Sequence, residues 1–180
     1  HTKALRNLDY DLFLVDYRGF GKSEGALSSE SDLTIDFQAV YDHLLKSYEE
    51  DQIILVGYSL GSGPVSYLAA NNSPQGVVLV APYTSLTDMK NEFFWMFPDF
   101  LMKYDMNNLG RLAQSTSPVY IIHGKADQLI PITMSQTIEA LDPDRIRLLE
   151  LEDTSHRGAI LHRRFGQVVR WAIDGVKPKI

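Results

Sequence analysis

Cysteine is absent from the 180 residues of the chain, which excludes disulfide bonds, thiolate metal sites and a cysteine nucleophile. Long apolar runs are also absent, and no segment approaches the roughly 18–20 residues that a membrane-spanning helix needs. The first residues carry no secretory signal pattern. These absences lead us to expect a cytoplasmic protein that does not span a membrane.

Positive charge is scarce, with 17 Lys and Arg against 23 Asp and Glu and a net charge of −6. Basic residues gather only in two short groups, Arg163 with Arg164 and Lys177 with Lys179. Because such groups are too small to follow a phosphate backbone, we predict no nucleic-acid partner. Internal repeats and low-complexity tracts are absent as well. The length and the 44% hydrophobic content predict one globular domain over residues 1–180.

Short apolar segments alternate with amphipathic segments along the chain. Strands are predicted at residues 11–16, 53–56, 77–80, 119–122 and 146–151. Helices are predicted near residues 33–48, 60–70, 133–141 and 159–173, the first with Ser31 or Asp32 as its N-cap. This alternation predicts the α/β class, with a mostly parallel sheet flanked by helices. In such sheets the active site lies at the carboxyl ends of the strands.

The pentapeptide Gly57-Tyr58-Ser59-Leu60-Gly61 matches the pattern G-x-S-x-G directly after a predicted strand. This pattern is typical of a sharp strand-to-helix turn that exposes a serine hydroxyl above the end of the sheet. Side chains beside that turn are expected to clash, which accounts for a glycine two residues away on either side. The alternative interpretation is a glycine-rich turn that contains a serine by coincidence.

A serine hydroxyl is a weak nucleophile and needs a base, which a third group must orient. Asp127 falls in the loop after the predicted strand 119–122, and His156 falls in the loop after strand 146–151. Both residues and Ser59 therefore follow strand ends, and their chain order is that of a nucleophile, an acid and a base. We predict that Ser59, Asp127 and His156 form a catalytic triad.

Two nearby residues are rivals for these roles. Asp153 could replace Asp127 as the acid, although it lies only three residues from His156 in the same loop. His123, at a strand end, is interpreted as a hydrogen-bonded core histidine rather than as the base. No histidine spacing such as H-E-x-x-H is present, so we predict neither a metal nor a cofactor.

Further segments carry a resemblance to a known superfamily. Residues 16–25 (Asp-Tyr-Arg-Gly-Phe-Gly-Lys-Ser-Glu-Gly) resemble the D-x-R-G-x-G-x-S-x-G segment of the alpha/beta-hydrolase superfamily of serine esterases, lipases, thioesterases and peptidases. Residues 81–85, 123–127 and 130–131 are similar to its branch of protein depalmitoylases and their bacterial relatives. The resemblance implies that Ser59 is the nucleophile, Asp127 the acid and His156 the base. Residues 16–25 are interpreted as a structural turn beneath the site.

The resemblance also implies an oxyanion hole that includes the backbone N–H of Leu60. Tyr58 beside it is predicted to share in oxyanion or substrate binding. The family takes its second N–H from a loop after the third strand, and neither that loop nor the first strands are found in this sequence. The resemblance therefore predicts an N-terminally truncated fold, either a fragment of a larger hydrolase or a trimmed version of it.

Residues 83–116 occupy the position of a short lid-like insertion in the superfamily. Aromatic and other apolar side chains are frequent there, from Phe93 to Met102. One interpretation is a hydrophobic wall for an acyl chain, because ligand pockets are lined mainly by such residues. The other is a short helix that packs its aromatic side chains on the sheet.

The predicted function is that of a serine hydrolase that cleaves carboxylic ester or thioester bonds through an acyl-enzyme intermediate. Its expected substrates are small molecules or acylated partners. A serine peptidase of the same fold is the nearest alternative, and a catalytically impaired fragment or scaffold is another. A membrane-surface module is disfavoured because the sequence has no basic amphipathic helix. The sequence indicates no particular oligomeric state.

Overall fold

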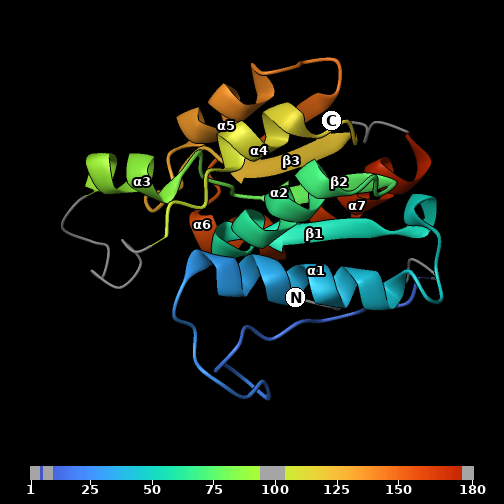
Figure 1. The fold of residues 1–180 in the computed structure, drawn as a ribbon. Coiled ribbons are helices and arrows are strands. Elements are labelled where there is room, and N and C mark those ends of the chain that lie inside the picture. Colours follow the sequence, from blue (N-terminus) through green and yellow to red (C-terminus); the bar gives the residue numbers. More distant parts are fainter. Residues whose placement is uncertain (1–4, 6–9, 94–103, 176–180) are drawn as a thin grey trace.

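A computed structural model describes residue 5 and residues 10–93 and 104–175 (Figure 1). Its centre is a sheet of four strands in the order β1 (Ile54–Tyr58), β2 (Gly76–Val80), β3 (Val119–Gly124) and β4 (Ile146–Leu151). Each strand pairs with the next in parallel. The predicted class, a parallel sheet flanked by helices, is therefore confirmed, and all four carboxyl ends lie at one edge of the sheet.

The two central strands are mostly apolar because helices cover both faces of the sheet, and His123 near the end of β3 is the exception. Every residue of β2 and β3 is buried. Successive side chains of a strand point to opposite faces, so Val77 and Leu79 enter one core while Val78 and Val80 enter the other.

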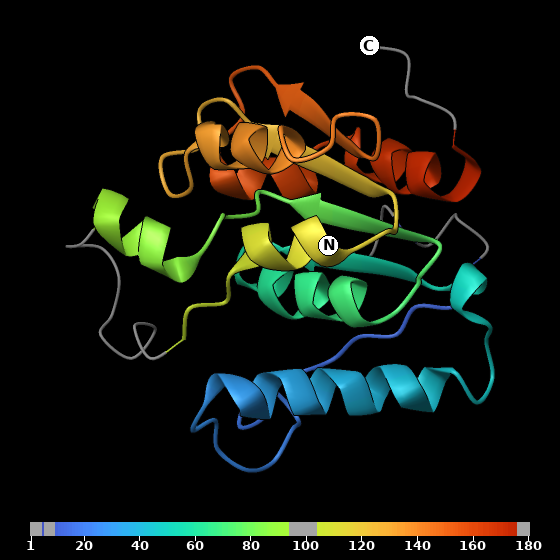
Figure 2. The ribbon, with the colours of Figure 1, turned by 45° about the horizontal axis from the view of Figure 1, so that its top comes forward.

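Helices form a layer on each face of the sheet (Figure 2). One layer contains α1 (Glu30–Leu44), α2 (Ser62–Asn71), α4 (Asn108–Gln114) and α5 (Ile132–Glu139). The other contains α6 (His156–Leu161) and α7 (Phe165–Asp174). Helix α3 (Leu86–Phe93) projects beyond the end of the sheet, and short 3-10 turns, η2 (Glu50–Gln52) and η3 (Ser59–Gly61), flank β1. None of the described helices has the length and apolar character of a membrane span.

The first predicted strand, at residues 11–16, is wrong. Residues 10–17 form no strand, and Leu14 is 73% exposed. A strand needs a neighbour for its hydrogen-bond ladder, and within the described residues no strand lies beside the outer edge of β1. The segment is held instead by side chains, such as the Tyr48 hydroxyl, which donates to Asp11 near the end of α1.

Two helix boundaries also differ from prediction. The N-cap of α1 is Ser29 rather than Ser31 or Asp32, because Asp32 takes the reciprocal position of a capping box and accepts from the Ser29 N–H. Hydrogen bonds from Ser28 and Ser29 lower the pKa of Asp32 to about 2. The closing helix is two helices, because the backbone becomes extended at His162 before the buried Phe165 begins α7.

The lid-like insertion is described only at its two ends, in α3 and α4. Most of its aromatic stretch, residues 94–103, lies outside the described residues, so the predicted acyl-chain wall stays a prediction. Residues 105–111, which follow the undescribed stretch, contact α1. The Glu30 carboxylate accepts from the Asp105 and Met106 N–H groups and pairs with Arg111. Helix α4 also packs against α2, where Arg111 donates to the Gly63 carbonyl oxygen.

Candidate active site

Ser59 occupies the turn between β1 and α2, where its backbone has a φ of 51°. A positive φ is rare for residues other than glycine, since it brings the side chain close to the backbone. Such strain is kept only where the surrounding structure enforces it, and it often marks a functional site. The conformation holds Ser59 at the end of the sheet where active sites of this class lie.

The two glycines of the pentapeptide have different reasons to be glycine. A Cβ at Gly57 would lie 2.7 Å from the carbonyl oxygen of Gly61, which is too close for any side chain. A Cβ at Gly61 would meet nothing nearer than the Tyr17 hydroxyl, at 3.8 Å. The predicted clash is therefore confirmed at Gly57 and wrong at Gly61, where the backbone is already helical with a φ of −63°.

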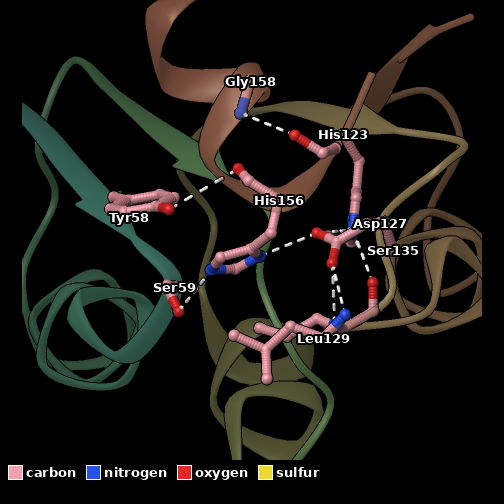
Figure 3. Close-up of polar contacts among 10 residues, drawn as sticks. Tyr58, Ser59, His123, Asp127, Leu129, Ser135, His156 and Gly158 are labelled. Carbon is pink, nitrogen blue, oxygen red and sulfur yellow. Dashed lines mark hydrogen bonds and ion pairs between the residues drawn. The ribbon is translucent and has the colours of Figure 1, made fainter. Parts of the chain in front are cut away.

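His156 connects Ser59 to Asp127 (Figure 3). Its Nε2 lies 3.0 Å from the Ser59 Oγ, and its Nδ1 lies 2.7 Å from Oδ2 of Asp127. Because a carboxylate only accepts hydrogen bonds, Nδ1 carries the proton and the Nε2 of the neutral ring accepts from the serine hydroxyl. The structure thus brings together all three residues that the sequence singled out, from the ends of β1, β3 and β4.

Asp127, at the inner end of this hydrogen-bond series, has a fully buried side chain. Burial by itself raises the pKa of a carboxyl group, but four donors outweigh it and hold the pKa of Asp127 well below its usual range. Oδ2 accepts from His123 and His156, while Oδ1 accepts from the N–H groups of Leu129 and Ile130 at 2.8 and 2.9 Å. The carboxylate is therefore charged and fixed in orientation.

His123 is a fully buried neighbour of Asp127, as expected for a hydrogen-bonded core histidine. Its Nε2 lies 3.1 Å from Oδ2 of Asp127 and 2.9 Å from the Ile130 carbonyl oxygen. Its Nδ1 lies 2.6 Å from the Oγ of Ser135, in α5. Sequence reasoning missed the contact with the acid. The spacing of four residues between His123 and Asp127 was its only sequence signal, and nothing indicated Ser135.

The rival acid, Asp153, is exposed in the turn after β4, and the His156 imidazole is hydrogen-bonded to Asp127 instead. Residues 16–25 form the compact turn that was predicted. Oδ2 of Asp16 accepts from the Lys22 N–H, and the Ser23 hydroxyl donates to the Asp16 carbonyl. These contacts stabilise the turn from within, and its role beneath the site stays a prediction.

Leu60 follows the serine in the first turn of a helix, where backbone N–H groups have no partner within the helix. Its N–H is thus available to an anion. Tyr58 lies against His156, with ring centroids 5.1 Å apart and its hydroxyl 3.5 Å from the His156 carbonyl oxygen. Burial and the nearby Asp127 raise the pKa of the Tyr58 hydroxyl. In the described part of the chain, no cluster of side chains suited to bind a metal ion is found.

The parallel sheet and the serine turn at the end of β1 define an alpha/beta hydrolase. The chain belongs to the family whose model is described as serine aminopeptidase, S33, which matches residues 1–112. An uncharacterized protein of Mycobacterium tuberculosis is 30% identical over 156 residues, which cover 85% of this chain and 55% of that protein. The chain spans about half to two-thirds of the length of the curated relatives it matches.

Solved structures show the same fold. An esterase from Rhodococcus sp. ECU1013 superposes with a TM-score of 0.71 at 21% identity, covering 97% of this chain and 84% of the esterase. An esterase from Pyrococcus furiosus has a TM-score of 0.66 at 19% identity, covering 88% of this chain and 68% of that one. At such identities the likeness concerns the fold alone.

Proposed function

We propose that the protein is a serine hydrolase that transfers the acyl group of a carboxylic ester or thioester to water. The observation that carries this proposal is the hydrogen-bond chain from Ser59 through His156 to Asp127. The strained backbone of Ser59 supports it, because that conformation exposes a nucleophile at the end of a strand. The esterases with the same fold support the choice of an acyl substrate.

The first half of the reaction forms an acyl-enzyme. His156 Nε2 takes the proton of the Ser59 hydroxyl while Oγ attacks the substrate carbonyl carbon. Asp127 holds the proton of His156 at Nδ1 and stabilises the imidazolium that forms. The Leu60 N–H donates to the oxyanion of the tetrahedral intermediate. When this intermediate collapses, the protonated His156 gives its proton to the departing alcohol or thiol.

The second half reverses these roles with water as the nucleophile. His156 takes a proton from water as the water oxygen attacks the acyl-enzyme carbonyl. Collapse of the second tetrahedral intermediate then breaks the bond to Ser59 Oγ, which recovers its proton from His156. All the proton transfers in this scheme run through residues of the chain. The expected substrates are small esters or thioesters, or acylated partners.

A peptidase of the same fold is the second candidate, because the matched family is described as a serine aminopeptidase. The same three residues can attack an amide carbonyl, so the geometry does not separate the two activities. Comparing kcat/KM for p-nitrophenyl esters with that for aminoacyl p-nitroanilides separates them. The alternative of a catalytically impaired scaffold predicts turnover of neither substrate.

The cytoplasmic location and the single domain expected from the sequence stay predictions.

Covalent labelling with a fluorophosphonate tests the proposed function. The Ser59 oxygen is expected to attack phosphorus and displace fluoride, which gives one adduct per chain by intact mass, mapped to Ser59. Ser59→Ala should abolish the adduct and lower ester turnover by about 10⁶-fold. The matched control is Ser31→Ala, which removes an exposed serine hydroxyl in α1, away from the site, and should label at near the native rate. Labelling or turnover that survives Ser59→Ala contradicts the assignment.

A further inference from the structure

One oxygen of Asp127 accepts hydrogen bonds from two serine–histidine pairs. We call Ser59 and His156 the outer arm, and Ser135 and His123 the inner arm. His156 Nδ1 and His123 Nε2 lie 2.7 and 3.1 Å from the same Oδ2. We propose that the inner arm positions the acid of the triad, with His123 as the positioning residue. This inference rests on the proposed function and extends it to a buried residue.

The partners of His123 fix where its proton lies. Nε2 faces the Asp127 carboxylate and the Ile130 carbonyl oxygen, and both groups only accept hydrogen bonds. Nε2 therefore donates. In the neutral ring, Nδ1 is then an acceptor and receives the hydroxyl proton of Ser135, 2.6 Å away. Ser135 thus holds the ring in the tautomer that donates to Asp127.

The inner arm fixes the orientation of the Asp127 carboxylate. The loop N–H groups of Leu129 and Ile130 hold Oδ1, and the inner arm holds Oδ2 from the side opposite His156 (Figure 3). The carboxylate is thereby fixed at both oxygens before substrate binds. Preorganised contacts of this kind keep the His156 imidazole aligned with the serine while protons move.

Burial rules out direct chemistry by the inner arm. The side chains of His123 and Ser135 are both 0% exposed, whereas the His156 side chain is 15% exposed. A substrate cannot reach either group of the inner arm. Its effect on the reaction must therefore pass through Asp127, and this requirement makes the proposal testable by a double-mutant cycle.

The test compares two conservative variants of the full chain, His123→Gln and His123→Asn. The amide nitrogen of Gln reaches about as far as Nε2 and can still donate to Asp127. The amide of Asn reaches only about as far as Nδ1, toward Ser135. We expect His123→Asn to lower kcat by about 10- to 100-fold, which is the loss typical of mutating a residue that hydrogen-bonds to a metal-binding side chain and orients it. KM should stay unchanged, and His123→Gln should retain most of the activity.

The cycle uses p-nitrophenyl acetate hydrolysis and fluorophosphonate labelling, with Asp127→Asn as the second background. His123→Asn should lose less than about twofold there, because the group through which it acts is already neutral. An equal loss in both backgrounds overturns the proposal, as does a Gln variant no better than Asn. If Ser59→Ala keeps its activity, the proposed function itself fails, and this outcome is distinct from either of those.

A spectroscopic measurement applies even where His123→Asn does not fold. With ¹⁵N-labelled histidine, the native chain should give two low-field imidazole N–H signals, from His156 Nδ1 and His123 Nε2. Asp127→Asn should shift both signals, whereas Ser135→Ala should shift the His123 signal and, through Asp127, the His156 signal. A His156 signal that does not respond to Ser135→Ala contradicts the proposal.

Discussion

The outer and inner arms contain the same residue types and meet at one carboxylate oxygen, yet they differ in two respects. Ser59 lies in a strained turn with a φ of 51°, while Ser135 lies inside the regular helix α5. The outer arm is partly open to solvent, while the inner arm is fully buried. A Ser–His–Asp set is therefore no sufficient sign of a nucleophile. Exposure and backbone setting separate Ser59, the proposed nucleophile, from the buried Ser135.

The two imidazole rings are also used in opposite directions. His156 turns Nδ1 to the acid and Nε2 to its serine, whereas His123 turns Nε2 to the acid and Nδ1 to its serine. Nε2 is the nitrogen farther from the backbone. The outer arm thus extends its basic nitrogen away from its own helix toward Ser59. The inner arm extends its donor nitrogen toward Asp127 instead.

Asp127→Asn breaks both arms at once and should have the largest effect on activity. An amide that donates toward His156 stabilises the wrong tautomer, so we expect kcat for ester hydrolysis to fall by about 10⁴-fold. The matched control is Asp153→Asn in the neighbouring turn, where the φ of 46° suits asparagine and activity should persist. A native rate in Asp127→Asn, or a comparable loss in Asp153→Asn, contradicts the assignment of the acid.

Paired glycine variants test whether backbone strain distinguishes the outer serine. Gly57→Ala forces a Cβ against the Gly61 carbonyl oxygen and must shift the backbone of the turn that carries Ser59. A shift of about 1 Å can cost about 10²-fold in rate. Gly61→Ala meets only the Tyr17 hydroxyl at 3.8 Å and should keep the native rate. Fluorophosphonate labelling rates measure both variants, and equal losses would contradict the steric difference between the two positions.

The pH dependence of stability measures how strongly the two arms hold the acid. The pKa of Asp127 is lower in the folded state than its unfolded value of about 3.9. Its contribution to stability is therefore complete above about pH 4 and is lost as the pH falls toward the folded pKa. In urea unfolding between about pH 5 and 2, Asp127→Asn should show a shallower fall in unfolding free energy than the native chain.

Some slope must remain in that variant, since the pKa values of Asp32, Asp36 and Glu150 are lowered in the same sense. Asp153→Asn serves again as the control and should follow the native curve. If Asp127→Asn and the native chain have the same slope, the four donors do not hold the carboxylate in solution as they do in the structure.

The sheet and the serine turn could be predicted from the sequence because their signals are local, whereas His156 was predicted from its place after a strand end and from the chain order of the three residues. Continuous apolar runs between turns located β2 and β3 to within two residues. The pentapeptide located the serine turn. Residues 11–16 carried an equally strong apolar signal and still form no strand, because pairing depends on a neighbour that composition does not reveal.

The inner arm could not be predicted because its contacts depend on packing between separate elements. His123 lies at the end of β3, and Ser135 comes from a helix that only the folded chain brings beneath it. Their sequence separation of 12 residues matches no motif. The prediction of His123 as a buried, hydrogen-bonded histidine was confirmed, whereas the identity of its partners required the structure.

The smallest expected effect concerns Tyr58, which contacts the outer arm and has no counterpart among the described contacts of the inner one. Its ring lies against the His156 imidazole, and its hydroxyl is 3.5 Å from the His156 carbonyl oxygen, a long hydrogen bond. Tyr58→Phe keeps the ring and should change kcat by less than about threefold. Tyr58→Leu replaces the flat ring and should lower kcat about tenfold through misalignment of the base.

The values of kcat and KM distinguish a supporting role of Tyr58 beside His156 from the substrate-binding role expected from the sequence. If Tyr58 only supports His156, KM stays constant in both variants and kcat alone falls. If its ring binds the acyl or leaving group, KM rises in Tyr58→Leu and varies with the size of the ester. Near-UV circular dichroism checks that each variant is folded, because Tyr58 also packs against the core formed by α6 and α7. A rise in KM would therefore place Tyr58 in the substrate site as well as beside the base.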